Sequence, residues 1–278
     1  MRPTAGQFWR ARRVVQGDAE SARYRHRVPR LGRTVARSVN NEQIEFLPAV
    51  GGTVSQVDRT ELWAIPFEDV APIRSAPAHK GQRNYTGEWW CVTVERHLAF
   101  ESWVERDFLI TADFDPEVIG LSVQPFTFHF HTRSSQPRSH TPDVFLRFRA
   151  GDATVVDVRP DALLDDRSRE AFEATHQLCE DVGWNYLRVG DQDPIRAANL
   201  RWLAGYRNRH NRNESLAARL LDELHSAGAT GIGALAARVG DPVIALPTLY
   251  HLMWTHEIMV DVDSAVLDMN VVIQARSQ

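Results

Sequence analysis

Hydrophobic residues recur with different periods in different parts of the chain. Within residues 39–75, three short alternating runs (IEFL, TVSQV and ELWAI) are separated by turn-forming residues, which predicts a small antiparallel β unit. Residues 76–87 are polar and rich in turn formers, so they are predicted to be a linker. Residues 1–38 show only weak periodicity, and we expect them to form an arm.

The central part of the chain alternates between helical and strand-like patterns. Apolar residues at helical spacing predict a helix over residues 100–112, and a polar loop is expected over residues 132–142. In order, the predicted elements are a strand at 89–94, the helix 100–112, strands at 118–123, 126–130, 144–148 and 154–158, a helix at 168–182, a strand at 184–189 and a helix from about 194. This order predicts an α/β fold with a mixed sheet flanked by helices.

The pattern changes after the polar residues 208–213. Three short helices are predicted at 214–226, 231–239 and 243–256, followed by an alternating tail at 259–273 that suits a hairpin. Winged-helix domains have this order, and their third helix reads the groove when they bind DNA. Small helical domains also mediate protein contacts, so both interpretations stay open. The predicted units span residues 1–83, 84–207 and 208–278.

Composition places the chain among ordinary globular proteins. Of its 278 residues, 43% are hydrophobic and 24% are charged. No apolar run approaches the ~18 residues needed to cross a bilayer, and the N-terminus lacks the apolar core of a secretory signal. Cys91 and Cys179 are too few for a disulfide framework. We therefore expect a cytoplasmic protein, associated with the nucleoid if it binds DNA.

The net charge of −4 conceals a strong asymmetry. Residues 1–40 contain ten arginines and two acids, a local balance of +8, which leaves −12 on the other 238 residues. A second basic stretch, Arg196–Arg212, contains five arginines and no acid. Such stretches are either solvated surfaces or contacts to nucleic-acid phosphates, which bind clustered cations by counterion release.

Three carboxylates and one arginine occupy positions suited to nuclease chemistry. Asp143 follows Pro142 at the head of a predicted strand, and Glu105 lies on the preceding helix. Asp157 and Arg159 are two residues apart on the next strand, so they share one face. Such carboxylates can share Mg²⁺, which polarises a phosphodiester and activates water. The alternative is a set of ordinary solvent-facing acids beside turns.

Four short motifs occur in a fixed order around these residues. They are Ser102-Trp103-Val104-Glu105, Gln124-Pro125-Phe126, Thr141-Pro142-Asp143 and Val156-Asp157-Val158-Arg159-Pro160. With these motifs, residues 84–207 resemble the TnsA family of transposon endonucleases, which work with a DDE transposase in heteromeric transposition systems. The segment Leu249–Leu252 with Trp254 is similar to the winged-helix domain of that family.

The resemblance implies a restriction-endonuclease-like fold with a PD-(D/E)xK active site that uses Mg²⁺, for which Mn²⁺ substitutes. Glu105 and Asp143 would be metal ligands. Asp157 stands where the family has Gln or Glu and would also bind metal, and Arg159 stands where it has Lys. Arginine keeps its proton in proteins, so Arg159 would stabilise charge on the phosphate and could not act as a base. Lys80 is the one lysine beside 31 arginines, so this replacement fits the composition.

The resemblance also implies a role in DNA recombination. The protein would cut the 5′ ends of the transposon by metal-dependent phosphodiester hydrolysis, while the DDE transposase processes the 3′ ends. An AAA+ ATPase regulator is the second expected partner, and the C-terminal domain would hold this regulator or the double-stranded DNA. Two alternatives remain: a restriction or defence nuclease, and a catalytically weakened DNA-binding assembly subunit in which Arg159 marks a decayed site.

Overall fold

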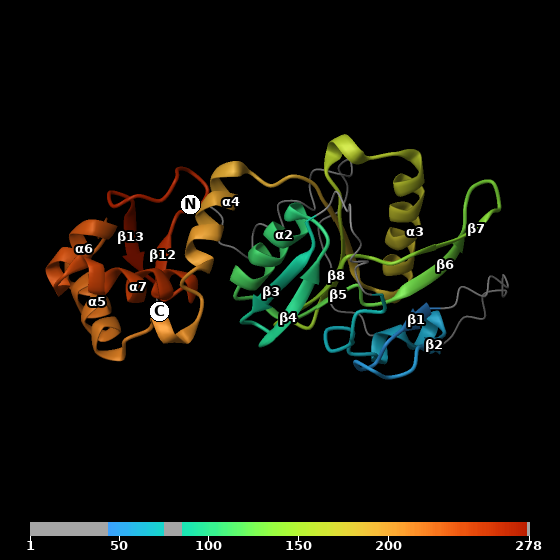
Figure 1. Cartoon of the computed structure of the whole chain (residues 1–278), viewed down its shortest axis with the longest axis horizontal. Helices are drawn as coiled ribbons and strands as arrows, with labels where there is room; N and C mark the ends of the chain where they lie inside the picture. The colour runs from blue at the N-terminus through green and yellow to red at the C-terminus, as the bar shows by residue number, and fades with distance from the viewer. Residues whose placement is uncertain (1–43, 75–84, 277–278) are drawn as a thin grey trace.

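The computed structural model describes residues 44–74 and 85–276 (Figure 1). The predicted arm and most of the predicted linker lie outside these residues. The strands are β1 (Ile44–Phe46), β2 (Ser55–Val57), β3 (Gly87–Cys91), β4 (Arg96–Phe100), β5 (Val118–Val123), β6 (Thr127–His131), β7 (Pro137–His140), β8 (Val144–Phe148), β9 (Ala153–Val158), β10 (Asn185–Val189), β11 (Thr230–Gly231), β12 (Ile258–Val260) and β13 (Val272–Ala275). The α-helices are α2 (Trp103–Phe114), α3 (Asp166–Val182), α4 (Pro194–Ala204), α5 (Glu214–Ala227), α6 (Ile232–Val239) and α7 (Pro242–Trp254), and the 3-10 helices are η1 (Arg59–Ala64), η2 (Asp161–Leu163) and η3 (Arg209–Asn211).

A four-stranded mixed sheet, in the order β10-β9-β8-β5, forms the centre of the molecule. β9 runs antiparallel to β8 and parallel to β10. Alternate residues of β9 enter two different cores: Val156 and Val158 pack with Phe108 and Leu109 of α2, and Val155 packs with Leu178 of α3. Helices α2 and α3 therefore cover opposite faces (Figure 1), which confirms the predicted mixed sheet flanked by helices.

The N-terminal β unit is joined to the central domain through a second sheet, in the order β2-β1-β6-β7. β1 pairs antiparallel with both β2 and β6. Phe67 is fully buried against Phe126, Phe145 and Trp184, in the core that also contains Leu178 of α3. Burial of these aromatic rings makes the unit part of the core of the central domain.

Four local predictions were wrong. The strand predicted at 89–94 ends at Cys91, because residues 92–95 form the turn of a hairpin whose second strand, β4, was not predicted. The run ELWAI forms η1 instead of a strand, since it inserts the single side chain of Leu62 into the core. The predicted polar loop contains β7, whose polar side chains give no apolar alternation and whose backbone pairs with β6. The predicted helix over 100–112 starts at Trp103, because Phe100 belongs to β4 and Ser102 caps the helix.

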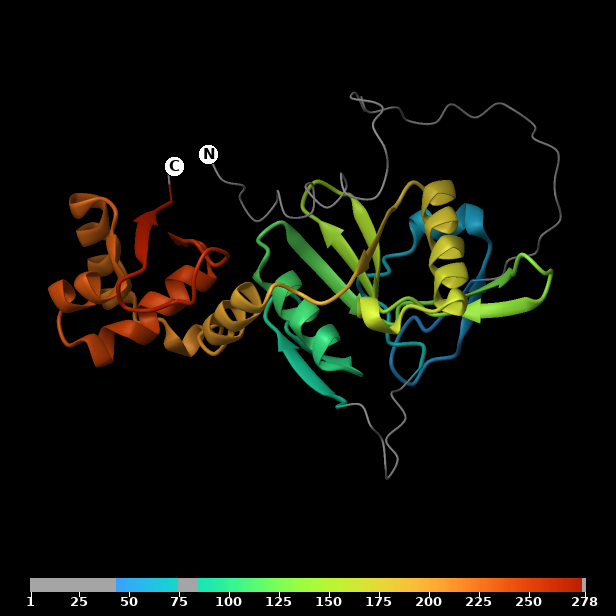
Figure 2. The ribbon, with the colours of Figure 1, turned by 90° about the horizontal axis from the view of Figure 1, so that it is seen from above.

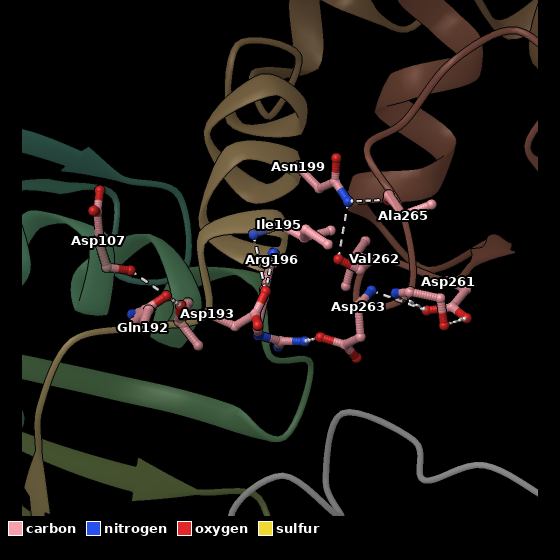
Figure 3. Close-up of polar contacts among 12 residues, drawn as sticks. Asp107, Gln192, Asp193, Ile195, Arg196, Asn199, Asp261, Val262, Asp263 and Ala265 are labelled. Carbon is pink, nitrogen blue, oxygen red and sulfur yellow. Dashed lines mark hydrogen bonds and ion pairs between the residues drawn. The ribbon is translucent and has the colours of Figure 1, made fainter.

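The C-terminal part contains the three predicted helices and the predicted hairpin, with β11 as an additional strand in the order β11-β13-β12. Helix α4, which follows the central sheet in the chain, is hydrogen-bonded to this C-terminal part. Asn199 donates to the carbonyls of Val262 and Ala265, and Arg196 pairs with Asp263 (Figure 3). Among the described residues, no helix combines the length and the hydrophobicity needed to cross a membrane.

Candidate active site

Glu105 is held in place at the first turn of α2. Its backbone N–H donates to the Ser102 hydroxyl (3.2 Å), and the same hydroxyl donates to Oε1 of Glu105 (3.0 Å). Oε2 accepts from the backbone N–H of Glu101 at 2.8 Å. Ser102 is therefore the N-cap of α2, and its bonds with Glu105, together with the bond from Glu101, fix both the start of the helix and the carboxylate. The S-x-x-E motif therefore has a structural role in orienting Glu105.

Asp143 is fixed by the strands on both sides of it. Its N–H donates to the carbonyl of Val156 (3.1 Å), and its Oδ2 accepts from the N–H of Val158 (2.7 Å), both on β9. Its carbonyl accepts from the N–H of Gln124, at the end of β5 (2.9 Å). The head of β8 thus presents one carboxylate in a single orientation.

Glu105 and Asp143 line one small pocket between α2 and the central sheet, together with Leu109, Gln124 and Val144. Burial, followed by the negative charges of Asp157 and Glu105, raises the pKa of Asp143 well above its ordinary value. Burial is also the main cause that raises the pKa of Glu105. The pocket therefore brings together two carboxylates whose negative charges a cation would stabilise.

Gln124 connects the components of this pocket. It is buried, with a φ of 47°, a left-handed conformation that is uncommon for a residue other than glycine. Its side-chain amide donates to Glu101 (2.7 Å), and its carbonyl accepts from the N–H of Ile73 (3.0 Å). These contacts give Gln124 a structural role in the pocket.

Asp157 lies on the opposite side of β9 from the apolar residues that pack on α2. Its side chain is buried, although the pattern also allowed a solvent-facing acid. One oxygen is 2.8 Å from Nε2 of His140, and the other accepts from the Tyr186 hydroxyl at 2.8 Å. The structure therefore brings Asp157 close enough to act on Asp143 through its charge, but both of its oxygens have protein partners. His140 and Tyr186 could not be identified from the sequence, because neither belongs to a recognisable motif.

Arg159 directly follows β9 and is not among the residues that line the pocket. Its side chain is exposed, and its Nε donates to the carbonyl of Leu163 at 3.2 Å. Arg74, from the N-terminal β unit, is the arginine whose charge acts on both Glu105 and Asp143. Nothing in the sequence indicated Arg74, because about 30 residues separate it from Glu105 and its position depends on the pairing of two sheets.

The two pocket carboxylates fit a divalent cation of the magnesium type. Within residues 44–74 and 85–276, no group of three or more His, Cys, Asp or Glu side chains is arranged to hold a metal ion. Mg²⁺ does not require such a cage, because it binds through one or two carboxylates and completes its shell with water and substrate phosphate. Glu105 and Asp143, both half-buried, meet that requirement, and a cation would relieve the mutual repulsion of their carboxylates.

The basic stretch Arg196–Arg212 is occupied largely by internal contacts. Arg196 pairs with Asp263, Arg201 with Asp107, Arg212 with Glu214 and Glu257, and Arg207 donates to the carbonyl of Trp90. These arginines connect α4 and the segment after it to the neighbouring elements. Their contacts favour a structural role for the stretch over a surface that binds phosphates.

A comparison with protein families gives one match. Residues 115–189 match the family model described as TnsA-like endonuclease N terminal. The matched segment includes Asp143, Asp157 and Arg159 and stops short of Glu105, which precedes it by ten residues. No curated protein matches the sequence. The match confirms the resemblance to TnsA-like endonucleases for this segment.

Proposed function

We propose that the protein is a DNA endonuclease subunit of a TnsA-type transposition system that hydrolyses phosphodiesters at the 5′ ends of the transposon. The observation that carries this proposal is the pocket in which Glu105 and Asp143 meet, with Asp143 inside the segment that matches TnsA-like endonucleases. The TnsA-like segment itself indicates a nuclease that acts in transposition. Metal dependence, the strand that is cut and the partners are parts of the proposal.

The topology supports a more specific assignment of the two folded parts. The order α2-β5-β8-β9-α3-β10, with three antiparallel strands followed by one parallel strand, supports a restriction-endonuclease-like core with a PD-(D/E)xK site. Asp143 would be the acid of its PD element. Three helices and a three-stranded antiparallel sheet support a winged-helix domain after residue 208.

The protein's own residues would perform three tasks in this chemistry. Glu105 and Asp143 would hold Mg²⁺ or Mn²⁺, and Asp157 would join them after exchanging its hydrogen bond to His140 or Tyr186. When bound, the metal ion supplies polarisation of the scissile phosphodiester and activation of water. Arg159 would leave the Leu163 carbonyl to stabilise negative charge on the phosphate. Ser102 and Gln124 keep the carboxylates in position throughout.

The C-terminal domain favours a protein partner over DNA at its third helix. Helix α7 contains neither lysine nor arginine, and Val243 and Ile244 in its first turn are 78% and 64% exposed. A helix that enters the major groove needs polar or cationic side chains for phosphates and base edges. We therefore assign this end of α7 to the DDE transposase or the AAA+ ATPase, and assign DNA contact to the other parts of the chain.

One observation favours a second candidate function. Arg159 stands where the family has lysine, and its Nε donates to the carbonyl of Leu163, so the residue expected to serve the phosphate is bonded to the protein backbone. A catalytically weakened subunit that binds DNA and assembles the transposition complex would tolerate this arrangement. The same arrangement is compatible with a nuclease only if another cation stabilises the charge on the phosphate or Arg159 leaves the Leu163 carbonyl.

Cleavage of labelled transposon-end duplexes tests the proposal. The full chain would be incubated with the partner transposase and with Mg²⁺, Mn²⁺ or Ca²⁺, and the cut strand and its ends would be mapped. We expect nicks at the 5′ ends with 3′-hydroxyl and 5′-phosphate products. Asp143→Asn and Glu105→Gln should each lower the rate by more than ~10²-fold, the scale of removing one strong electrostatic stabiliser.

Glu173→Gln is the matched control, because it converts an exposed carboxylate on α3 to an amide far from the pocket. Its cleavage rate should equal that of the unaltered protein. Normal cleavage by Asp143→Asn would remove the pocket from the mechanism. If transposition proceeds with partners present but the 5′ ends stay uncut, the assembly role is the correct one.

A further inference from the structure

The N-terminal β unit ends beside the acidic pocket. The N–H of Ile73 donates to the carbonyl of Gln124 (3.0 Å), and the N–H of Gln124 donates to the carbonyl of Asp143 (2.9 Å). A bridge between Leu47 and Ala71 holds the same segment against β1. Two backbone hydrogen bonds thus connect Ile73, the residue before Arg74, with Asp143 at the head of β8.

The side chain of Arg74 is held only weakly. Its guanidinium lies 3.4 Å from the Glu101 carboxylate, near the upper limit for a hydrogen bond, and is 47% exposed. Glu101 already accepts a 2.7 Å bond from the amide of Gln124. Exposed ion pairs of this kind contribute ~0–1 kcal/mol to stability, so an anion that binds more strongly can displace Glu101 from the guanidinium.

The charge around the pocket requires such a cation. Glu101 acts on Glu105 through its negative charge, and Asp157 and Glu105 act on Asp143 in the same way, so these carboxylates would repel an approaching phosphate. Arg74 acts on Glu105 and on Asp143 through its charge, while the side chain of Arg159 is turned to Leu163. Among the described residues, Arg74 is therefore well placed to face an anion bound over the pocket.

We propose that Arg74 contacts the DNA phosphate at the scissile position and makes the N-terminal β unit a working part of the nuclease site. This inference rests on the proposed function. The planar guanidinium offers two parallel N–H groups to the non-bridging oxygens of a phosphodiester. Binding of DNA replaces the long contact to Glu101 with charge-assisted bonds to the phosphate. The substrate class is a DNA backbone phosphate, recognised without regard to base sequence.

DNA binding without cleavage tests the contact by itself. Affinity for a transposon-end duplex would be measured in Ca²⁺ over a series of salt concentrations, with Asp143→Asn as the background. Adding Arg74→Ala should reduce the slope of log K against log salt by about 1, the value for one cation that no longer neutralises a phosphate. Arg133→Ala is the matched control, because Arg133 is also exposed and pairs with Glu173 at 3.4 Å. Its slope should not change.

Cleavage with the partner transposase gives the second readout, using variants that keep Asp143. Arg74→Ala should lower the rate by ~10²-fold. Arg74→Lys should keep part of the rate, and added methylguanidinium should restore part of it to Arg74→Ala. A residue with a purely structural role would show neither recovery, and its removal would lower the melting temperature as well.

The two proposals fail in different ways. If Asp143→Asn cuts DNA normally, the pocket is not the nuclease site, but a smaller salt slope in Arg74→Ala still supports the phosphate contact. If the salt slope and the rate of Arg74→Ala both equal those of Arg133→Ala, the inference about Arg74 is wrong while the proposed function stands. Loss of activity without recovery by lysine or methylguanidinium would also overturn it.

Discussion

Arg159 directly follows β9, where the resemblance to the TnsA family implies a lysine, and its side chain donates to the carbonyl of Leu163. Strand alternation correctly places Val156 and Val158 on the apolar side that packs on α2. Alternation does not determine where a long, flexible side chain ends, because four rotatable bonds separate the guanidinium from the backbone. The position of the charge in the site is therefore a separate question from the position of the residue in the strand.

Substitutions at Arg159 separate an active site from a decayed one. If Arg159 serves the phosphate, Arg159→Lys should keep part of the cleavage activity because the charge remains. Arg159→Ala should cost ~10²-fold and Arg159→Gln nearly as much, since polarity without charge does not stabilise a developing anion. The rates would be measured on end-containing duplexes with the partner transposase.

Arg149→Ala is the control for this series, because Arg149 is also exposed and also donates to a backbone carbonyl, that of Pro116. It should leave cleavage unchanged. A normal rate for Arg159→Ala, in a reaction that demonstrably cuts both 5′ ends, would exclude Arg159 from catalysis. A lysine variant faster than the unaltered protein would indicate a weakened nuclease.

At the scale of elements, the apolar pattern predicted the strands and helices whose side chains form the cores. Strands β5 and β8 have the predicted bounds, and β9, α3 and β10 begin or end within two residues of theirs, because each buries a regular series of side chains. β7 was missed because its pairing with β6 needs no apolar side chains. The joining of β1 to β6 was missed because register between distant strands is not encoded in either strand alone.

The residues of the candidate site also fall into two groups, those that the sequence identified and those that it did not. Glu105 and Asp143 were identified because each belongs to a short motif at the start of a periodic element. The partners of Asp157, the connecting role of Gln124 and the approach of Arg74 depend on contacts between segments that are far apart in the sequence. Local patterns carry no information about such contacts, so only the folded chain reveals them.

Helix α4 provides an element-scale prediction about how the C-terminal domain is attached. Asn199 is buried, and its amide donates to the carbonyls of Val262 and Ala265 (Figure 3). Its side-chain oxygen accepts from the N–H of Leu267. Asn199→Ala would leave these buried backbone groups without their partner. At ~1 kcal/mol or more for each bond, we expect a loss of about 2–4 kcal/mol in the free energy of unfolding, measured by urea titration.

Asn208→Ala is the matched control, because the Asn208 side chain makes no capping hydrogen bond to η3. This variant should stay within about 0.5 kcal/mol of the unaltered protein. Equal stability of the two variants would mean that the contacts of Asn199 do not hold the loop after β12 against α4.

At the scale of the whole molecule, the N-terminal β unit and the C-terminal helices lie at opposite ends of the central domain (Figures 1 and 2). The acidic pocket lies between them, under α2. The charge is also divided, with +8 on residues 1–40 and −12 on the remainder. The part of the chain after residue 40 is negatively charged, so it needs either a cationic segment or metal ions to approach DNA.

Residues 1–40 should therefore supply salt-sensitive DNA affinity that does not depend on base sequence. Deleting them should flatten the slope of log K against log salt by about 0.9 for each phosphate that they neutralise. The measurement compares the full chain with the truncated chain on transposon-end and unrelated duplexes. An unchanged slope would show that the segment serves a protein partner or is simply solvated.

The central claim is that Glu105 and Asp143 together hold the catalytic metal ion. A crystal of the full chain soaked in Mn²⁺ tests it most directly, because anomalous scattering locates the ion without relying on activity. We expect a peak in the pocket between the two carboxylates, with oxygen ligands at ~2.1 Å, and no such peak in Asp143→Asn. An empty pocket at a Mn²⁺ concentration that supports cleavage, or a peak bound elsewhere, would contradict the claim.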